Sequence, residues 1–200
     1  MRTVLLRTEG HCSTKSTASR LTIQSINSHY KREPSCCIEL GTQDSNMPKR
    51  SQIGDIIEIP TSKGLAYAQY THQHPTHGDL IRVFDVVFKH RPSRFSELVN
   101  GPVRFSTFFP VTAAVKGGVF NVVGHESVAF HNQPFPVFRN GIADPKTKKV
   151  AVWWFWDGEK EWKVGEITAE QRKMPIVGVW NDTLLIERIE AGWAPSNDPS

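Results

Sequence analysis

The sequence predicts an α+β fold: a mainly antiparallel twisted sheet or partly open β-barrel, with a few short helices and a C-terminal helix. Short runs of β-branched and aromatic residues recur between turn residues, which is typical of antiparallel strands. The dipeptide Asp157-Gly158 stands between two Trp-rich runs and is a strong hairpin signal. Apolar residues at helical spacing over 185–193 predict the C-terminal helix.

The first part of the predicted domain is rich in strands. Turn residues at 60–64 separate its first two runs and predict an opening hairpin. A short helix is expected over 94–99, with Ser93 as its N-terminal cap. The strands predicted in this part are 55–59, 65–73, 80–88, 103–111 and 119–123.

The second part begins with glycines and prolines over 124–145, where we expect irregular structure. A strand over 150–156 then leads into Asp157-Gly158, which predicts a type I′ turn, and 162–164 is the return strand. Thr168 and Gln171 have the spacing of a capping box at the start of a short helix. For the last helix, Asn181 or Asp182 is the expected cap, and Gly192 follows its end.

Composition excludes several classes of protein. The chain has 200 residues, of which 38% are hydrophobic and 22% charged, as in an ordinary soluble globular protein. Its apolar runs are far shorter than the ~18 residues of a membrane-spanning helix, so no membrane partner is expected. Three cysteines predict neither a disulfide framework nor a zinc site. We therefore expect a cytoplasmic protein without a cofactor.

The composition changes near Met47. Residues 1–46 contain 13 Ser or Thr but only one of the 20 aromatic residues, Tyr30. Such a segment has little apolar area with which to offset the entropy of ordering. We predict a disordered leader, or a misplaced gene start with Met47 as the true one. A single domain over 47–195 and a disordered tail over 196–200 are expected to follow.

Three histidines, His72, His74 and His77, lie close together in the sequence beside Asp79. On a strand, the H-x-H spacing of the first two places both rings on one face, where imidazoles can bind zinc, nickel or copper. Pro75 in the same stretch favours an exposed loop instead. No nucleophile elbow, phosphate loop or zincin motif occurs in the sequence. The chain is therefore predicted not to be an enzyme.

Tryptophans and charge are unevenly distributed. On a strand, Trp154 and Trp156 share one face and Trp153 takes the other. Residues 47–150 contain 13 Lys or Arg and 7 Asp or Glu, whereas 151–200 contain 5 and 9. An acidic, Trp-rich C-terminal quarter can attract and anchor a charged partner.

Ordered motifs from Ile53 to Trp193 resemble the immunity protein 26 family of bacterial polymorphic toxin systems. They are Gly-Asp-Ile-Ile-Glu-Ile-Pro at 54–60, Gly-Leu-Ala-Tyr-Ala-Gln-Tyr at 64–70, Trp-Trp-Phe-Trp-Asp-Gly at 153–158 and Trp-Asn-Asp-Thr-Leu-Leu-Ile-Glu-Arg-Ile-Glu at 180–190. The resemblance implies a non-enzymatic protein that binds a protein toxin domain and neutralises it. Inhibitors of nucleases are commonly acidic, whereas this chain has a net charge of +4.

The predicted contact surface combines aromatic anchors with acidic residues. Its residues are Trp156, Asp157, Glu159, Glu161 and Trp162 on the hairpin, with Glu187 and Glu190 on the last helix. The oligomeric state is left open.

Two alternative functions remain open. Nucleic acid is not the favoured partner, but a small β-barrel with a basic patch could stack single strands. The candidate patch is Arg82, Lys89, Arg91, Arg94 and Arg104. A metal-dependent enzyme would use His72, His74 and His77.

Overall fold

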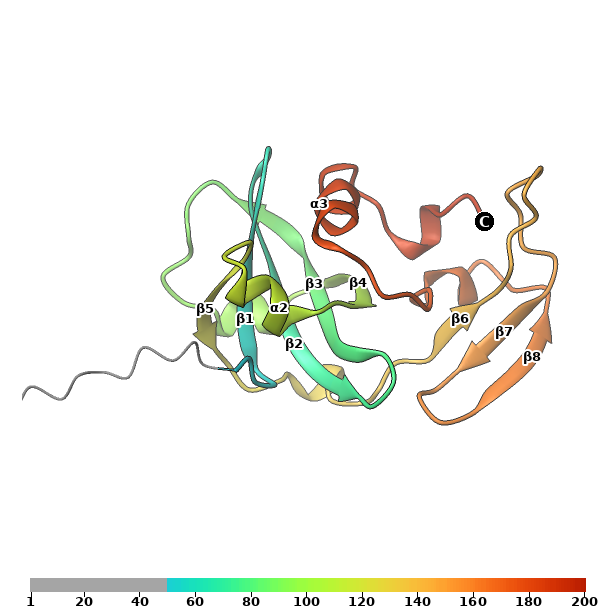
Figure 1. The fold of residues 1–200 in the computed structure, drawn as a ribbon, viewed down its shortest axis with the longest axis horizontal. Coiled ribbons are helices and arrows are strands. Elements are labelled where there is room, and N and C mark those ends of the chain that lie inside the picture. Colours follow the sequence, from blue (N-terminus) through green and yellow to red (C-terminus); the bar gives the residue numbers. More distant parts are fainter. Residues whose placement is uncertain (1–49) are drawn as a thin grey trace, which may run out of the picture. The chain divides into compact units, whose positions relative to one another are not determined.

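The computed structural model describes residues 50–200, which fall within one compact unit. Two antiparallel sheets and a few short helices make up this unit, so the predicted α+β class is confirmed (Figure 1). Neither sheet closes into a barrel, so of the two predicted forms the structure has the mainly antiparallel sheet. The predicted leader, 1–46, lies outside the described residues.

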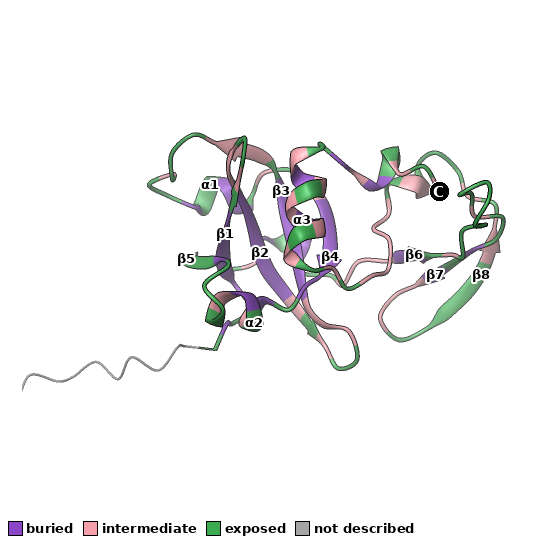
Figure 2. Cartoon of the chain, turned by 45° about the horizontal axis from the view of Figure 1, so that its top comes forward, coloured by how far each residue is buried: buried purple, intermediate pink, exposed green. Residues whose placement is uncertain are grey.

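The first sheet has the strand order β4-β3-β2-β1-β5. Its strands are β1 (Asp55–Thr61), β2 (Gly64–His74), β3 (Gly78–Phe88), β4 (Val103–Phe108) and β5 (Asn121–His125). The opening hairpin of β1 and β2 is confirmed, with Ile57 paired to Ala68. Both faces of this sheet are covered, since residues that alternate along its central strands enter two different apolar clusters. Figure 2 shows these central strands as the most buried part of the domain.

Short helices cover the two faces. One face packs against α2 (Val111–Lys116) and α3 (Asp182–Glu190), and the other packs against α1 (Ser96–Val99). The predicted strand over 103–111 ends at Phe108, because Val111 already begins α2. The predicted Ser93 cap is also wrong, since α1 begins after Phe95 and has no side-chain cap.

The C-terminal helix follows the sequence signals. The Asn181 side chain accepts a hydrogen bond from the Leu184 amide at 2.8 Å and caps α3. Gly192, with a φ of 66°, takes the left-handed conformation that commonly ends a helix. Leu185 and Ile189 are buried against the first sheet, which confirms the predicted apolar stripe.

The second sheet has the order β6-β7-β8. Its strands are β6 (Phe138–Asn140), β7 (Trp153–Trp156) and β8 (Glu161–Gly165). β6 lies within the segment predicted to be irregular. The hairpin between β7 and β8 is confirmed, but its type I′ turn is not. Gly158 has a φ of 101° whereas Asp157 has no positive φ, and the Asp157 amide donates to the Lys160 carbonyl.

The chain beyond β8 contains η2 (Gln171–Lys173) and η3 (Pro195–Asn197), two single-turn 3₁₀ helices. Thr168 and Gln171 exchange side-chain-to-amide hydrogen bonds of 2.9 and 3.2 Å, so the capping box is confirmed.

The end of the chain lies against the domain, and the disordered tail over 196–200 stays a prediction. Asp198 accepts from the Trp193 indole at 3.0 Å, and the Ser200 carbonyl accepts from Arg172 at 2.8 Å. Over residues 50–200, no helix combines the length and the apolar composition needed to cross a membrane.

Candidate functional site: a groove beside Trp154

The second sheet is attached to the first through a cluster of aromatic rings, which we call the aromatic junction. Its members are His74, His77, Phe108, Phe135, Phe138 and Trp156. Phe108 stacks on Phe138 with ring centroids 5.2 Å apart, so a residue of β4 packs on one of β6. Trp156 contacts His77 at 4.7 Å and His74 at 5.0 Å between centroids. The junction fixes β6–β8 relative to the main sheet.

His74 and His77 belong to this junction, and His72 lies beside it against Phe135. His74 Nε2 lies 3.0 Å from the Gly158 carbonyl oxygen, and its Nδ1 accepts from the amides of Thr76 and His77. These partners match a ring whose Nε2 donates and whose Nδ1 accepts. His72 Nε2 lies 2.7 Å from the Gln133 carbonyl oxygen. Within residues 50–200, no group of three or more His, Cys, Asp or Glu is arranged to hold a metal ion.

Burial affects the pKa of His72 and of His77. It lowers the pKa of His72, with the nearby Arg82 guanidinium acting in the same direction. It also lowers the pKa of His77, which lies beside His74. Both rings are therefore held in the neutral form that their apolar neighbours favour.

Asp157 supports the hairpin turn. Its Oδ1 accepts from the amides of Glu159 and Lys160 at 2.9 and 2.7 Å. These backbone donors, with that of Lys160 first, hold the pKa of the Asp157 carboxyl below its usual range. Because its carboxylate is occupied in this way, Asp157 shapes the turn between β7 and β8.

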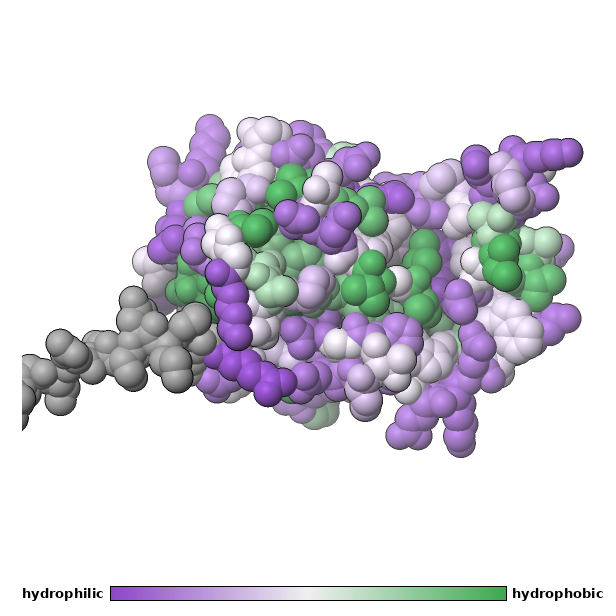
Figure 3. Space-filling view, viewed as in Figure 1, coloured by the Kyte–Doolittle hydropathy of each residue, from purple (hydrophilic) through white to green (hydrophobic). Residues whose placement is uncertain are grey.

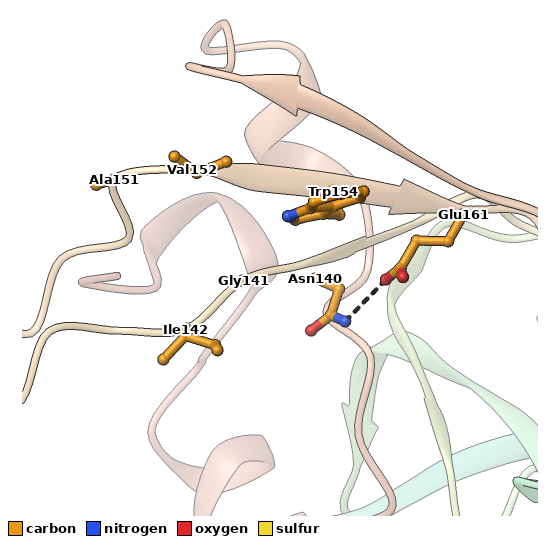
Figure 4. Close-up of a pocket in the computed structure, with 7 residues that line it drawn as sticks. All are labelled: Asn140, Gly141, Ile142, Ala151, Val152, Trp154 and Glu161. Carbon is orange, nitrogen blue, oxygen red and sulfur yellow. Dashed lines mark hydrogen bonds between the residues drawn. The ribbon is translucent and has the colours of Figure 1, made fainter.

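Beyond the aromatic junction, the second sheet carries an open groove, which we call the Trp154 groove. It has a volume of about 360 Å³. Asn140, Gly141, Ile142, Ala151, Val152, Trp154 and Glu161 line it (Figure 4). Ile142 is 93% exposed, and Trp154 and Val152 are each 39% exposed. Figure 3 shows hydrophobic side chains gathered over the part of the surface formed by β6–β8.

The groove and the junction lie on the same face of the second sheet. Trp154 pairs with Asn140 on one side and with Lys163 on the other. Two residues along, Trp156 pairs with Phe138 and Glu161. Because side chains alternate along a strand, all these residues share one face. One end of the face is buried against the main sheet and the other is open.

Trp153 and Phe155 occupy the opposite face, as the alternation predicts, and are 2% and 5% exposed. The Arg139 guanidinium lies 4.6 Å from the Trp153 ring centroid and donates to the Pro195 carbonyl at 2.5 Å. At Trp153 this face is therefore covered by the C-terminal part of the chain, whereas the Trp154 groove lies open.

The groove has one ionisable group among its lining residues, Glu161. Asn140 Nδ2 donates to Glu161 Oε1 at 3.1 Å, shown as the dashed line in Figure 4. Glu161 Oε2 forms no hydrogen bond with any other residue of 50–200. In the same view, the Trp154 indole lies between Val152 and Glu161 and faces Asn140. The groove thus has an apolar end and an anionic end.

In the structure, the predicted contact residues lie in three separate places. Trp156, Glu159 and Glu161 line one depression, which adjoins the Trp154 groove through Asn140 and Glu161. Trp162 is 41% exposed but contacts Phe155, on the opposite face of the sheet.

The two helix glutamates lie elsewhere. Glu187 is exposed on α3, and the Glu190 carboxylate accepts from the Ser62 amide at 2.6 Å in the β1–β2 turn. Figure 1 shows α3 well apart from β8. The structure does not bring the acidic residues of the helix and the hairpin together.

The candidate basic patch is largely engaged in internal contacts. Arg82 donates to the carbonyl groups of Asn132 and Pro134, and burial lowers its pKa to about 10. Arg91 forms two hydrogen bonds with the buried carboxylate of Glu58, at 2.7 and 2.8 Å. Arg104 pairs with Asp85 at 2.6 Å and also donates to the carbonyl of Ile189.

The remaining two residues of that patch, Lys89 and Arg94, are exposed. Three of the five basic residues therefore act as internal donors in the structure, and two are available at the surface.

Sequence reasoning missed most of the Trp154 groove. It placed Trp154 on the same face as Trp156, but it named only the latter as a contact. Asn140 ends the short strand β6 and Ile142 lies two residues beyond it, and both fall within a segment predicted to be irregular. The period-two pattern of β7 contains the signal for Trp154, whereas nothing in the local pattern identifies Ile142.

The fold and this groove define a small α+β domain with a preformed apolar groove that ends in a carboxylate. No family model, curated protein or solved structure matches the chain.

Proposed function

We propose that this chain is an immunity or immunity-like protein that neutralises a cognate bacterial toxin by stoichiometric binding. The domain would act by covering the toxin's active surface, without turnover. Two independent lines support the proposal: the motif resemblance seen in the sequence and the surface of the second sheet.

The single observation that carries the binding function is the Trp154 groove. A contiguous exposed apolar surface next to a polar group is typical of protein-binding sites. Trp154, Val152 and the strongly exposed Ile142 form that surface, and Glu161 lies at its end. Tryptophan is among the residues that contribute most to protein–protein affinity, and its truncation commonly costs about 2 kcal/mol or more. That loss corresponds to a roughly 30-fold weaker complex.

The experiment uses the gene that neighbours the one encoding this chain. We expect it to encode a large secreted protein with a C-terminal toxin domain. Expression of that domain in bacteria should stop growth, and the full chain expressed alongside it should restore growth. The purified pair should form a one-to-one complex on size-exclusion chromatography.

The Trp154→Ala variant should lose protection while it retains the melting temperature of the wild-type chain. Trp162→Ala is the matched control, because Trp162 has nearly the same exposure but lies on the opposite face. Protection by Trp154→Ala equal to that of the wild type would contradict the role of the groove. A toxin domain that kills equally with and without the wild-type chain would contradict the function itself.

A further inference from the structure

We infer that the Trp154 groove recognises an arginine side chain on a basic surface of the partner, held between the Trp154 indole and the Glu161 carboxylate. This inference rests on the proposed function and names the chemistry of the partner. It replaces the earlier expectation of a surface made of hairpin and helix residues together.

The first argument is the open face of Trp154. The chain covers two of its other tryptophans with its own arginines: Arg139 lies 4.6 Å from the Trp153 ring centroid, and Arg188 lies 4.8 Å from that of Trp193. Among residues 50–200, no cation lies over the Trp154 ring in this way. An exposed indole is the aromatic group that attracts cations most strongly. The ring face of Trp154 is therefore open to a cation from a partner, whereas Trp153 and Trp193 already contact arginines of the same chain.

The second argument is the position and state of Glu161. It is the only ionisable residue that lines the groove, and it lies on the strand next to Trp154. Asn140 holds Oε1 of this carboxylate, which leaves Oε2 for a partner. A planar guanidinium carries several N–H donors and stacks on aromatic rings, so it satisfies the carboxylate and the indole together.

The third argument is the shape and charge around the pair. The aliphatic stem of an arginine would lie along Ile142 and Val152, since long cationic side chains cover apolar surface with their methylene groups. Glu159 lines the adjoining depression and adds a second negative charge. Lys163 is the exposed cross-strand neighbour of Trp154 and lines neither depression, so its charge opposes a bound cation and the two glutamates must outweigh it.

The test uses nuclear magnetic resonance of the uniformly ¹⁵N-labelled full chain. N-acetyl-L-arginine amide is titrated in, and N-acetyl-L-citrulline amide is the uncharged control of the same shape. The Trp154 indole signal is assigned by its absence in the Trp154→Phe variant. We expect arginine to shift this signal saturably and to bind at least threefold more tightly than citrulline.

A Glu161→Gln variant should lose most of the preference for arginine over citrulline, since only the indole and the more distant Glu159 remain to favour the cation. Glu187→Gln, which changes an acidic residue on α3, is the matched control and should behave as the wild type. Equal binding of the two probes, no shift of the Trp154 signal, or an unchanged preference in Glu161→Gln would overturn the inference.

Affinity for the toxin domain separates this inference from the proposed function. Glu161→Gln should weaken the complex at least tenfold. Neutralisation that is insensitive to Glu161→Gln would refute the arginine site and leave the immunity function standing. Arginine-selective binding by a chain that does not protect against the toxin would support the arginine site and refute the immunity function.

Discussion

Replacing Trp156 with alanine should destabilise the whole domain, because this ring connects the two sheets. Its centroid lies 4.7–6.0 Å from those of five rings: His74, His77, Phe108, Phe135 and Phe138. A fully buried Trp→Ala change costs about 3–5 kcal/mol, and each aromatic pair contributes about 0.5–1.5 kcal/mol beyond its area. Since one side of Trp156 lines an open depression, we expect a loss of about 3 kcal/mol.

The assay is thermal and urea unfolding followed by circular dichroism. For a domain of this size, about 3 kcal/mol corresponds to a fall of about 6–12 °C in melting temperature. Trp162→Ala removes a tryptophan side chain that is 41% exposed, on the opposite face of the hairpin, and should cost less than about half as much. A Trp156→Ala loss below about 1 kcal/mol, or equal losses for the two variants, would refute the claim that the aromatic junction holds the sheets together.

Three further predictions concern the scaffold. Burial lowers the folded-state pKa of His72 and His77, so their contribution to stability is complete above about pH 6.5 and is lost as the pH falls below it. Melting temperature measured from pH 7.5 to 5 should therefore decline, and a His72→Asn/His77→Asn variant should decline less. Arg91→Ala leaves the buried Glu58 carboxylate without its cation and should lower the free energy of unfolding measured in urea at pH 7, by less than the loss of a fully buried pair because Arg91 itself is half exposed. Asn181→Ala removes the cap of α3 and should cost about 1 kcal/mol by the same measurement.

The sequence predicted those features that depend on neighbours in the chain. The cap at Asn181 and the reciprocal pair of Thr168 and Gln171 each need only residues three positions apart. The hairpin of β1 and β2 is likewise set by the turn that joins it. Predictions failed where the outcome depends on distant segments. β6 is three residues long, which is too short for its own composition to carry a strand signal. It is a strand because it pairs with β7.

In the candidate site too, the local sequence predicts which residues share a face, whereas distant segments decide which of them are buried. Alternation along β7 predicts correctly that Trp154 and Trp156 share a face. Which of them is buried depends on how far the main sheet reaches across that face, and this is set by Phe108 on β4. Sequence reasoning therefore chose Trp156 as an anchor for a partner, whereas the structure uses it to hold the domain together. Trp154, one pleat further along, is the ring left open to solvent.

This arrangement explains how a small sheet can present a rigid binding surface. A small sheet needs a packed hydrophobic face to be stable, and a groove on a mobile sheet would lose affinity because binding would have to order it. Here the face that carries the Trp154 groove is continuous with the face that is buried in the aromatic junction, and Asn140 already orients the Glu161 carboxylate. The packing of Trp156 and its neighbours orders the second sheet when the domain folds. A partner would then meet a preformed indole and carboxylate, and the affinity of the groove would depend on the packing beneath it as much as on its own residues.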